Sequence, residues 1–117
     1  MPGYMWAAGL VKANGTQITG TGQVGFTSGR LLGYPTGVYF ITFASAHPLG
    51  ANYIVNVTAQ GNVCYISSGA AGPTSTYFKV AVYAVGTTTP ADGVFNFMVL
   101  TSLYLHDLQI IHKLSII

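Results

Sequence analysis

The segment from Val38 to Phe43 constrains the fold more than any other part of the chain. It reads Val-Tyr-Phe-Ile-Thr-Phe, and such a run of β-branched and aromatic residues favours a β-strand. Neighbouring side chains of a strand point to opposite faces, so Val38 and Phe40 share one face and Tyr39, Ile41 and Phe43 share the other. Both faces are apolar, and each therefore needs a cover. We expect the opposite sheet of a sandwich to cover one face, and a neighbouring subunit to cover Tyr39, Ile41 and Phe43.

Turn residues divide the rest of the chain into runs of similar length. In the run that begins at Tyr53, Val55 and Val57 point one way, whereas Asn56 and Thr58 point the other. This alternation is typical of an antiparallel strand that has one face in solvent. The predicted strands cover residues 9–13, 16–21, 23–27, 38–43, 53–59, 63–67, 77–85 and 94–100.

The spacing of these runs predicts the fold class. The strands recur at intervals of roughly 8–12 residues and are separated by turns rich in glycine and proline. The first turn, Asn14-Gly15, is the strongest short signal for a β-hairpin. We therefore predict an all-β protein, an antiparallel β-sandwich of the jelly-roll type with about eight strands. The alternating apolar side chains of 77–85 and 94–100 are expected to face its core.

The predicted strands belong to one domain, at residues 7–100. Residues 1–6 include Pro2 and Gly3 and suit a linker or the cut edge of a longer chain. Residues 101–117 contain none of the glycines, and their apolar spacing fits a short helix as well as a strand. We expect this segment to be a C-terminal extension, for which packing at a subunit interface is one option.

Charged residues are scarce for a soluble domain. Four lysine or arginine residues and two aspartates make up 5% of the chain, whereas about a quarter is usual. Charged side chains normally keep a domain soluble and monomeric. We infer that the folded chain covers much of its surface with copies of itself. The cations are scattered, which argues against nucleic-acid binding, and the absence of an apolar run of about 18 residues argues against membrane insertion.

The sequence offers little for acid–base catalysis or for metal binding. The two aspartates, Asp92 and Asp107, fall in a predicted turn and in the C-terminal extension, so they do not form a carboxylate pair. His106 and His112 are out of phase for one helix face, and His47 is predicted in a turn. Because zinc sites combine several ligands at short spacings, we expect all three to be surface or interface histidines.

Two weaker signals also have ordinary interpretations. The lone cysteine, Cys64, lies in a predicted strand and is expected to be a small buried hydrophobic residue. The spacing of Gly20, Gly22 and Gly25 matches a dinucleotide fingerprint, but no helix or βαβ unit follows it. We therefore predict no catalytic residue, no cofactor and no metal site, and we expect that the chain is not an enzyme.

Aromatic residues provide the remaining candidate contacts. Most of them are expected in the core, but Tyr34 and Tyr65 fall in or beside predicted turns. An exposed tyrosine can stack on a sugar or fill a pocket of a partner, so these two are candidates for contact with a receptor or glycan. Tyr83, on the predicted outer face of its strand, is a further candidate for the interface between subunits.

Several segments resemble known jelly rolls. Residues 29–43, GRLLGYPTGVYFITF, are similar to the strand Pro-Gly-x-Tyr-x-Phe-x-[Thr/Ser]-[Phe/Tyr] of the complement/tumour-necrosis-factor family. Residues 94–100, VFNFMVL, are similar to the closing strand of that family, Phe-x-Gly-Phe-Leu-Leu. Residues 8–16 and 22–27 resemble small domains near the ends of phage tail fibres and viral fibre proteins. The calcium-binding residues of some complement-type heads have no match here.

The resemblance implies a homotrimer around a threefold axis, often at the tip of a fibre. The leading hypothesis is a non-enzymatic structural and attachment domain of a viral or phage fibre, spike or capsid decoration. It would lie on the virion surface and bind a host receptor or glycan. Two alternatives stay open: a secreted, extracellular ligand domain of the complement type, and a trimerisation module of a polysaccharide-degrading enzyme.

Overall fold

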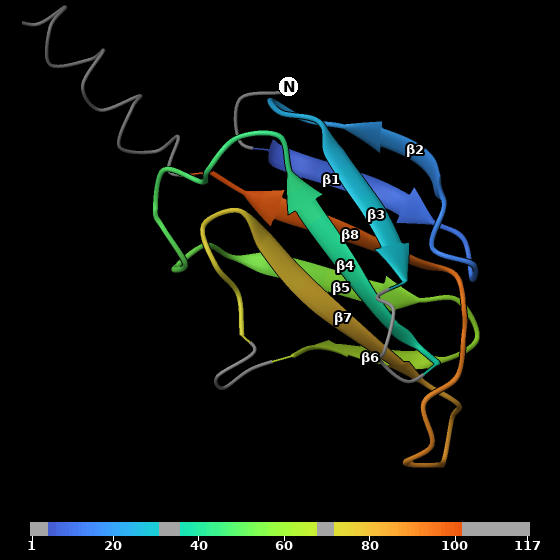
Figure 1. Ribbon diagram of the computed structural model, residues 1–117. Coiled ribbons are helices and arrows are strands. Elements are labelled where there is room, and N and C mark those ends of the chain that lie inside the picture. The colour runs from blue at the N-terminus through green and yellow to red at the C-terminus, as the bar shows by residue number, and fades with distance from the viewer. Residues whose placement is uncertain (1–4, 31–35, 68–71, 102–117) are drawn as a thin grey trace, which may run out of the picture.

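The computed structural model describes residues 5–30, 36–67 and 72–101, and these form eight β-strands (Figure 1). Turns and irregular segments, but no helix, connect the strands within these ranges. The strands are β1 (Met5–Val11), β2 (Gln17–Thr21), β3 (Phe26–Arg30), β4 (Val38–Phe43), β5 (Val55–Ala59), β6 (Val63–Ile66), β7 (Tyr77–Tyr83) and β8 (Phe95–Leu100).

The strands form two four-stranded sheets that pack face to face (Figure 1). The first sheet has the order β2-β1-β8-β5 and the second has the order β3-β4-β7-β6. Every pair of neighbouring strands is antiparallel. The predicted all-β antiparallel sandwich is confirmed, and the finer jelly-roll winding stays a prediction.

The core lies between the sheets and is built from alternate side chains of each strand. Phe78, Val80 and Val82 of β7 are fully buried, and the aromatic side chains of β8, Phe95 and Phe97, meet them from the other sheet. The predicted core faces of these two strands are therefore confirmed. Their outward neighbours on β8 are exposed, as the period of two requires.

The face assignment predicted for β4 is wrong. Tyr39, Ile41 and Phe43 are buried in the core of the single chain, with exposed fractions of 0%, 0% and 5%. Their side chains therefore face the opposite sheet and are not available to a neighbouring subunit. The outer face of β4 instead carries Val38 and Phe40, which are partly exposed. Both faces of this strand are apolar, so its own pattern did not decide which one points inward.

Several strand boundaries also differ from the prediction, most of all at β1 and β3. The first strand begins at Met5, so Met5 and Trp6, expected in a linker, belong to the first sheet. The strand predicted at 23–27 lies later, at β3, because the N–H groups of Gln23 and Val24 donate to the carbonyls of Met5 and Trp6.

His47 was predicted at the surface or an interface and lies inside the molecule, with 3% of its surface exposed. Its Nδ1 accepts a hydrogen bond from the Leu49 N–H at 3.0 Å. Its Nε2 lies 2.7 Å from the carbonyl oxygen of Leu100, so this nitrogen is the donor in the neutral ring. The ring packs edge-on against Trp6, with centroids 5.1 Å apart. His47 thus joins the loop after β4 to the end of β8.

Two glycines allow a large ring to enter the core. Phe26 of β3 is 9% exposed, and its ring packs edge-on against Phe97 at 4.8 Å between centroids. The space for the ring is provided by Gly9 of β1 and Gly20 of β2, which are cross-strand partners. A Cβ added at Gly20 would lie 2.7 Å from a carbon of the Phe26 ring, which is shorter than any normal contact. The close approach of the two sheets at this point therefore requires glycine.

Candidate binding surfaces

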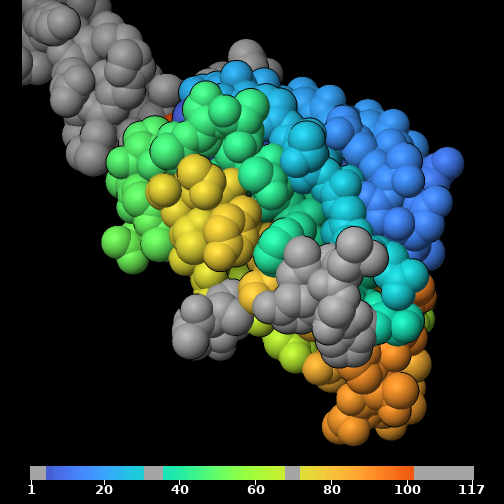
Figure 2. All heavy atoms as spheres, viewed as in Figure 1, coloured from blue at the N-terminus to red at the C-terminus, as the bar shows by residue number. Residues whose placement is uncertain are grey.

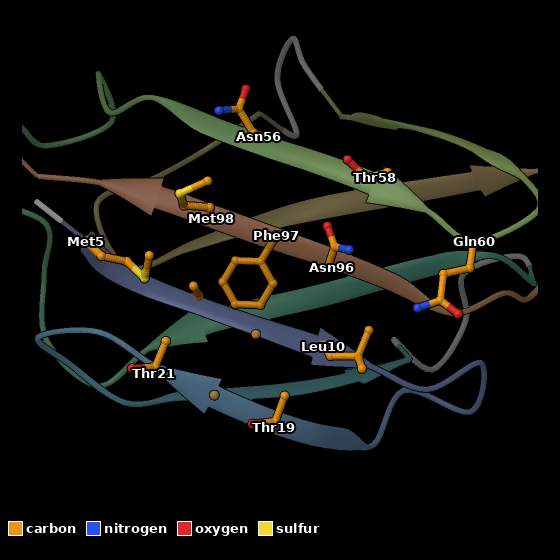
Figure 3. Close-up of a pocket in the computed structure, with 13 residues that line it drawn as sticks. Met5, Leu10, Thr19, Thr21, Asn56, Thr58, Gln60, Asn96, Phe97 and Met98 are labelled. Carbon is orange, nitrogen blue, oxygen red and sulfur yellow. The ribbon is translucent and has the colours of Figure 1, made fainter. Parts of the chain in front are cut away.

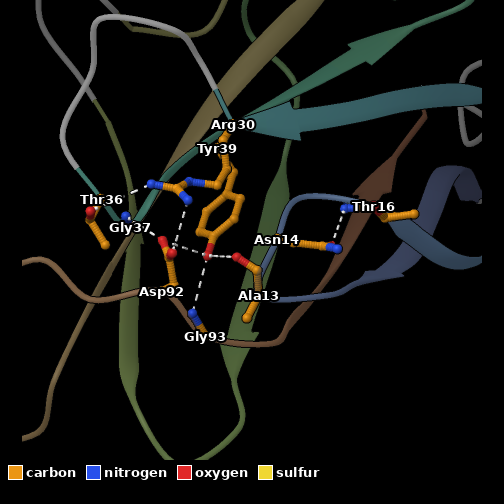
Figure 4. Close-up of polar contacts among 9 residues, drawn as sticks. All are labelled: Ala13, Asn14, Thr16, Arg30, Thr36, Gly37, Tyr39, Asp92 and Gly93. Carbon is orange, nitrogen blue, oxygen red and sulfur yellow. Dashed lines mark hydrogen bonds and ion pairs between the residues drawn. The ribbon is translucent and has the colours of Figure 1, made fainter.

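Three ionisable side chains, those of Arg30, Tyr39 and Asp92, gather at one end of the sandwich (Figure 4). The Tyr39 hydroxyl donates a hydrogen bond to the carbonyl of Ala13 at 2.7 Å and accepts one from the N–H of Gly93 at 3.1 Å. Asp92 accepts a hydrogen bond from the N–H of Gly37 at 2.8 Å, and its other oxygen lies 3.1 Å from the Arg30 guanidinium. The cluster therefore joins the hairpin after β1, the start of β4 and the turn before β8.

This cluster serves the fold and has no free acid or base. Burial, assisted by the neighbouring charge of Asp92, raises the pKa of the Tyr39 hydroxyl, so it stays protonated at neutral pH. The Asp92 carboxylate is already occupied by a backbone N–H and by Arg30. Within residues 5–30, 36–67 and 72–101, no group of three or more His, Cys, Asp or Glu side chains could hold a metal ion. The same residues contain no helix of the length and apolarity that a membrane span needs.

A pair of tyrosines stands on the outer face of the second sheet. The hydroxyls of Tyr65 on β6 and Tyr83 on β7 lie 2.7 Å apart, and their rings meet edge-on with centroids 5.3 Å apart. This hydrogen bond is the main reason that the pKa of the Tyr65 hydroxyl is raised. Val63, the cross-strand partner of Tyr83, is 51% exposed, and Tyr65 is 49% exposed. We call Val63, Tyr65 and Tyr83 the tyrosine patch.

The tyrosine patch brings together residues that the sequence assigned to different roles. Tyr65 was predicted to contact a receptor or glycan, and Tyr83 was predicted to contact another subunit. Since the two side chains touch, one partner would meet both.

The segment between β7 and β8, which begins just beyond Tyr83, projects past the end of the sandwich (orange in Figure 2). Tyr34, the other predicted contact, lies outside the described residues.

The outer face of the first sheet carries a hollow of about 480 Å³ (Figure 3). Outward side chains from all four strands line it in two rows across the sheet, as the strand registers require. The rows are Thr21, Ala8, Met98, Asn56 and then Thr19, Leu10, Asn96, Thr58. Ala8 is small and only 8% exposed, and it lies between the larger side chains of its cross-strand partners, Thr21 and Met98.

The lining of the hollow is mostly apolar, and its polar groups are uncharged. Amides come from Asn56, Asn96 and Gln60, and hydroxyls come from three threonines. Each amide offers two N–H donors and one carbonyl acceptor. Among the described residues, the side chains of Asn56 and Asn96 have no hydrogen-bond partner in the protein, and both are exposed. The hollow therefore presents free donors and acceptors to solvent.

The hollow is not predicted by the sequence, although part of its signal is visible there. The alternation of β5 correctly placed Asn56 and Thr58 on the outer side. What the pattern does not show is that β8 lies between β1 and β5, which brings Asn96 beside Thr58.

Comparisons with known proteins find no matching family model, no similar curated protein and no similar solved structure.

Proposed function

We propose that this chain is a non-enzymatic attachment domain that assembles as a homotrimer and binds a receptor or glycan on a host surface. Its setting would be a viral or phage fibre, spike or capsid decoration, and its location the virion surface. The observation that carries the proposal is the chemistry of the two outer sheet faces. They expose amide, hydroxyl, tyrosine and aliphatic groups, whereas the described ion pair, Arg30 with Asp92, lies at one end of the sandwich.

The tyrosine patch is the surface that best fits contact with another copy. Tyrosine is enriched at the centres of protein interfaces, where it contributes a large apolar area with little loss of conformational entropy. Here Tyr65 and Tyr83 already satisfy one hydroxyl hydrogen between them, which reduces the cost of removing the pair from water. Val63 adds an exposed aliphatic side chain beside them. This contact replaces the one that was predicted through the buried face of β4.

The homotrimer is tested by light scattering of the purified protein. A mass of about 37 kDa is expected, three times the 12.3 kDa of one chain. The double variant Tyr65→Ala, Tyr83→Ala should shift the protein towards a monomer because it removes the aromatic area of the patch. Ile54→Ala is the matched control, since Ile54 is exposed and lies elsewhere in a loop. An unaltered protein that stays a monomer at micromolar concentration would contradict the proposed assembly.

A further inference from the structure

We propose that the hollow on the first sheet binds a neutral saccharide of one or two rings. The inference deepens the attachment role proposed above and gives it a place and a ligand class. The volume of about 480 Å³ lies within the range of small-molecule sites, about 300–1,000 Å³. Figure 3 shows the side chains of Asn56, Asn96 and Thr58 standing along the β5 and β8 side of this hollow.

The free hydrogen-bonding groups favour a ligand that is rich in hydroxyls. A hydroxyl group both donates and accepts, so it can pair with an amide in either sense. Asn56 and Asn96 lie on adjacent strands, and Asn96 is the direct cross-strand partner of Thr58. These side chains have no protein partner within the described ranges. They can therefore bind successive hydroxyls of one sugar without breaking a hydrogen bond of the fold.

The apolar residues of the hollow suit the C–H groups on the faces of a sugar ring. Leu10 and Met98 come from neighbouring strands and flank Asn96 and Ala8. Met98 is 38% exposed, and its flexible thioether adapts to irregular surfaces. A pyranose ring presents C–H groups on its faces and hydroxyls around its edge. The hollow offers the same combination of aliphatic and hydrogen-bonding groups.

The absence of charged side chains from the hollow favours a neutral ligand. None of the residues that line it is ionisable. An acidic sugar would lose hydration without meeting a cation, and a cationic ligand would meet no carboxylate. A second copy of the chain is a poorer occupant, because interface centres are enriched in aromatic side chains and arginine. No aromatic side chain points outward here, since Phe97 of β8 is 3% exposed and belongs to the core.

The test is a titration of the full chain with sugars, monitored by ¹H–¹⁵N NMR spectra. The probes are cellobiose, lactose and N,N′-diacetylchitobiose at millimolar concentrations, with 3′-sialyllactose as the acidic comparison. At least one neutral sugar should shift signals of β1, β5 and β8 and bind more tightly than the acidic one. Asn96→Ala and Asn56→Ala should each weaken binding about fivefold, equivalent to about 1 kcal/mol for one lost hydrogen bond. Thr27→Ala, exposed on the outer face of the second sheet, is the matched control and should change nothing.

The outcomes separate this inference from the proposed function. If none of the neutral sugars shifts the spectrum, or the shifts map to the tyrosine patch, the saccharide site is wrong even though the trimer is intact. If Asn96→Ala changes the mass of the assembly and not the sugar affinity, a second copy of the chain occupies the hollow and the inference is also wrong. A monomer that binds the sugar at β5 and β8 supports the site and contradicts the trimer. The dispersion of each variant's spectrum shows that it is folded.

Discussion

Replacing Gly9 by alanine should destabilise the sandwich, because the new methyl group would occupy the space of the Phe26 ring. A Cβ at this position would lie 2.6 Å from the Cε1 atom of Phe26 and 2.8 Å from the carbonyl oxygen of Thr19. The ring cannot easily move aside, because Phe97, the cross-strand partner of Gly9 on β8, packs edge-on against it. The Thr19 carbonyl belongs to β2, which is paired with β1, so the backbone would also have to move.

The size of the effect follows from two opposing terms. Adding a methyl group to a filled core usually costs about 1–3 kcal/mol. Replacing glycine also lowers the entropy of the unfolded chain, which returns about 0.4–1 kcal/mol. A net loss of about 1–2 kcal/mol in the free energy of unfolding is therefore expected for Gly9→Ala. In a domain of this size, that loss lowers the Tm by roughly 4–8 °C.

Urea unfolding, followed by fluorescence and circular dichroism, measures this difference. Gly25→Ala and Gly29→Ala are matched controls, since a Cβ at either position meets no atom within 4 Å and neither has a positive φ. Both should be neutral or slightly stabilising. In a Phe26→Leu background the cost of Gly9→Ala should fall, because the shorter side chain leaves room for the methyl group. Equal costs in both backgrounds, or a Gly9→Ala protein as stable as the original, would refute the steric explanation.

Two further predictions concern buried tyrosine hydroxyls. Tyr39→Phe leaves the Gly93 N–H and the Ala13 carbonyl without this partner, so it should lower the free energy of unfolding in urea by about 1–3 kcal/mol. A decrease below about 0.5 kcal/mol would show that water replaces the hydroxyl. Burial raises the pKa of the Tyr53 hydroxyl far above its ordinary value of about 10. As the pH rises, the unfolded chain therefore loses this proton before the folded protein does. The contribution of Tyr53 to the free energy of unfolding is complete below about pH 10 and declines as the pH rises further. Tyr53→Phe should therefore flatten the alkaline decline measured between about pH 8 and 11, and parallel curves for the two proteins would contradict this assignment.

Much of the fold could be predicted because most strands alternate cleanly. In β5, the apolar side chains of Val55, Val57 and Ala59 alternate with the polar Asn56 and Thr58, so a period of two identifies the core face. In β4 both faces are apolar, and the same rule gives no answer. The face that points inward there includes Tyr39, whose hydroxyl meets backbone groups 26 and 54 residues away in the chain. Such contacts depend on the tertiary structure and leave no local pattern.

The candidate surfaces were harder to predict than the strands. Tyr65 was selected correctly as an exposed aromatic residue, but its pairing with Tyr83, 18 residues later, depends on the register of β6 on β7. The hollow depends on the strand order of the first sheet, which places a small residue, Ala8, between larger side chains. A single sequence shows which side chains point outward, but it does not show which strands are neighbours.

Because of the register of β1 on β8, the resistance of the sandwich to a pulling force should depend on the direction of that force. Met5 is the partner of Leu100, so the first and last strands of the described domain meet at one end of the first sheet. A force that pulls these two residues apart loads the ladder at its end and opens it like a zipper, one hydrogen bond after another. A force between Leu100 and the hairpin at residues 12–16 acts along the strands, where the whole ladder shares the load. The same fold should thus yield readily to one direction of pull and resist another.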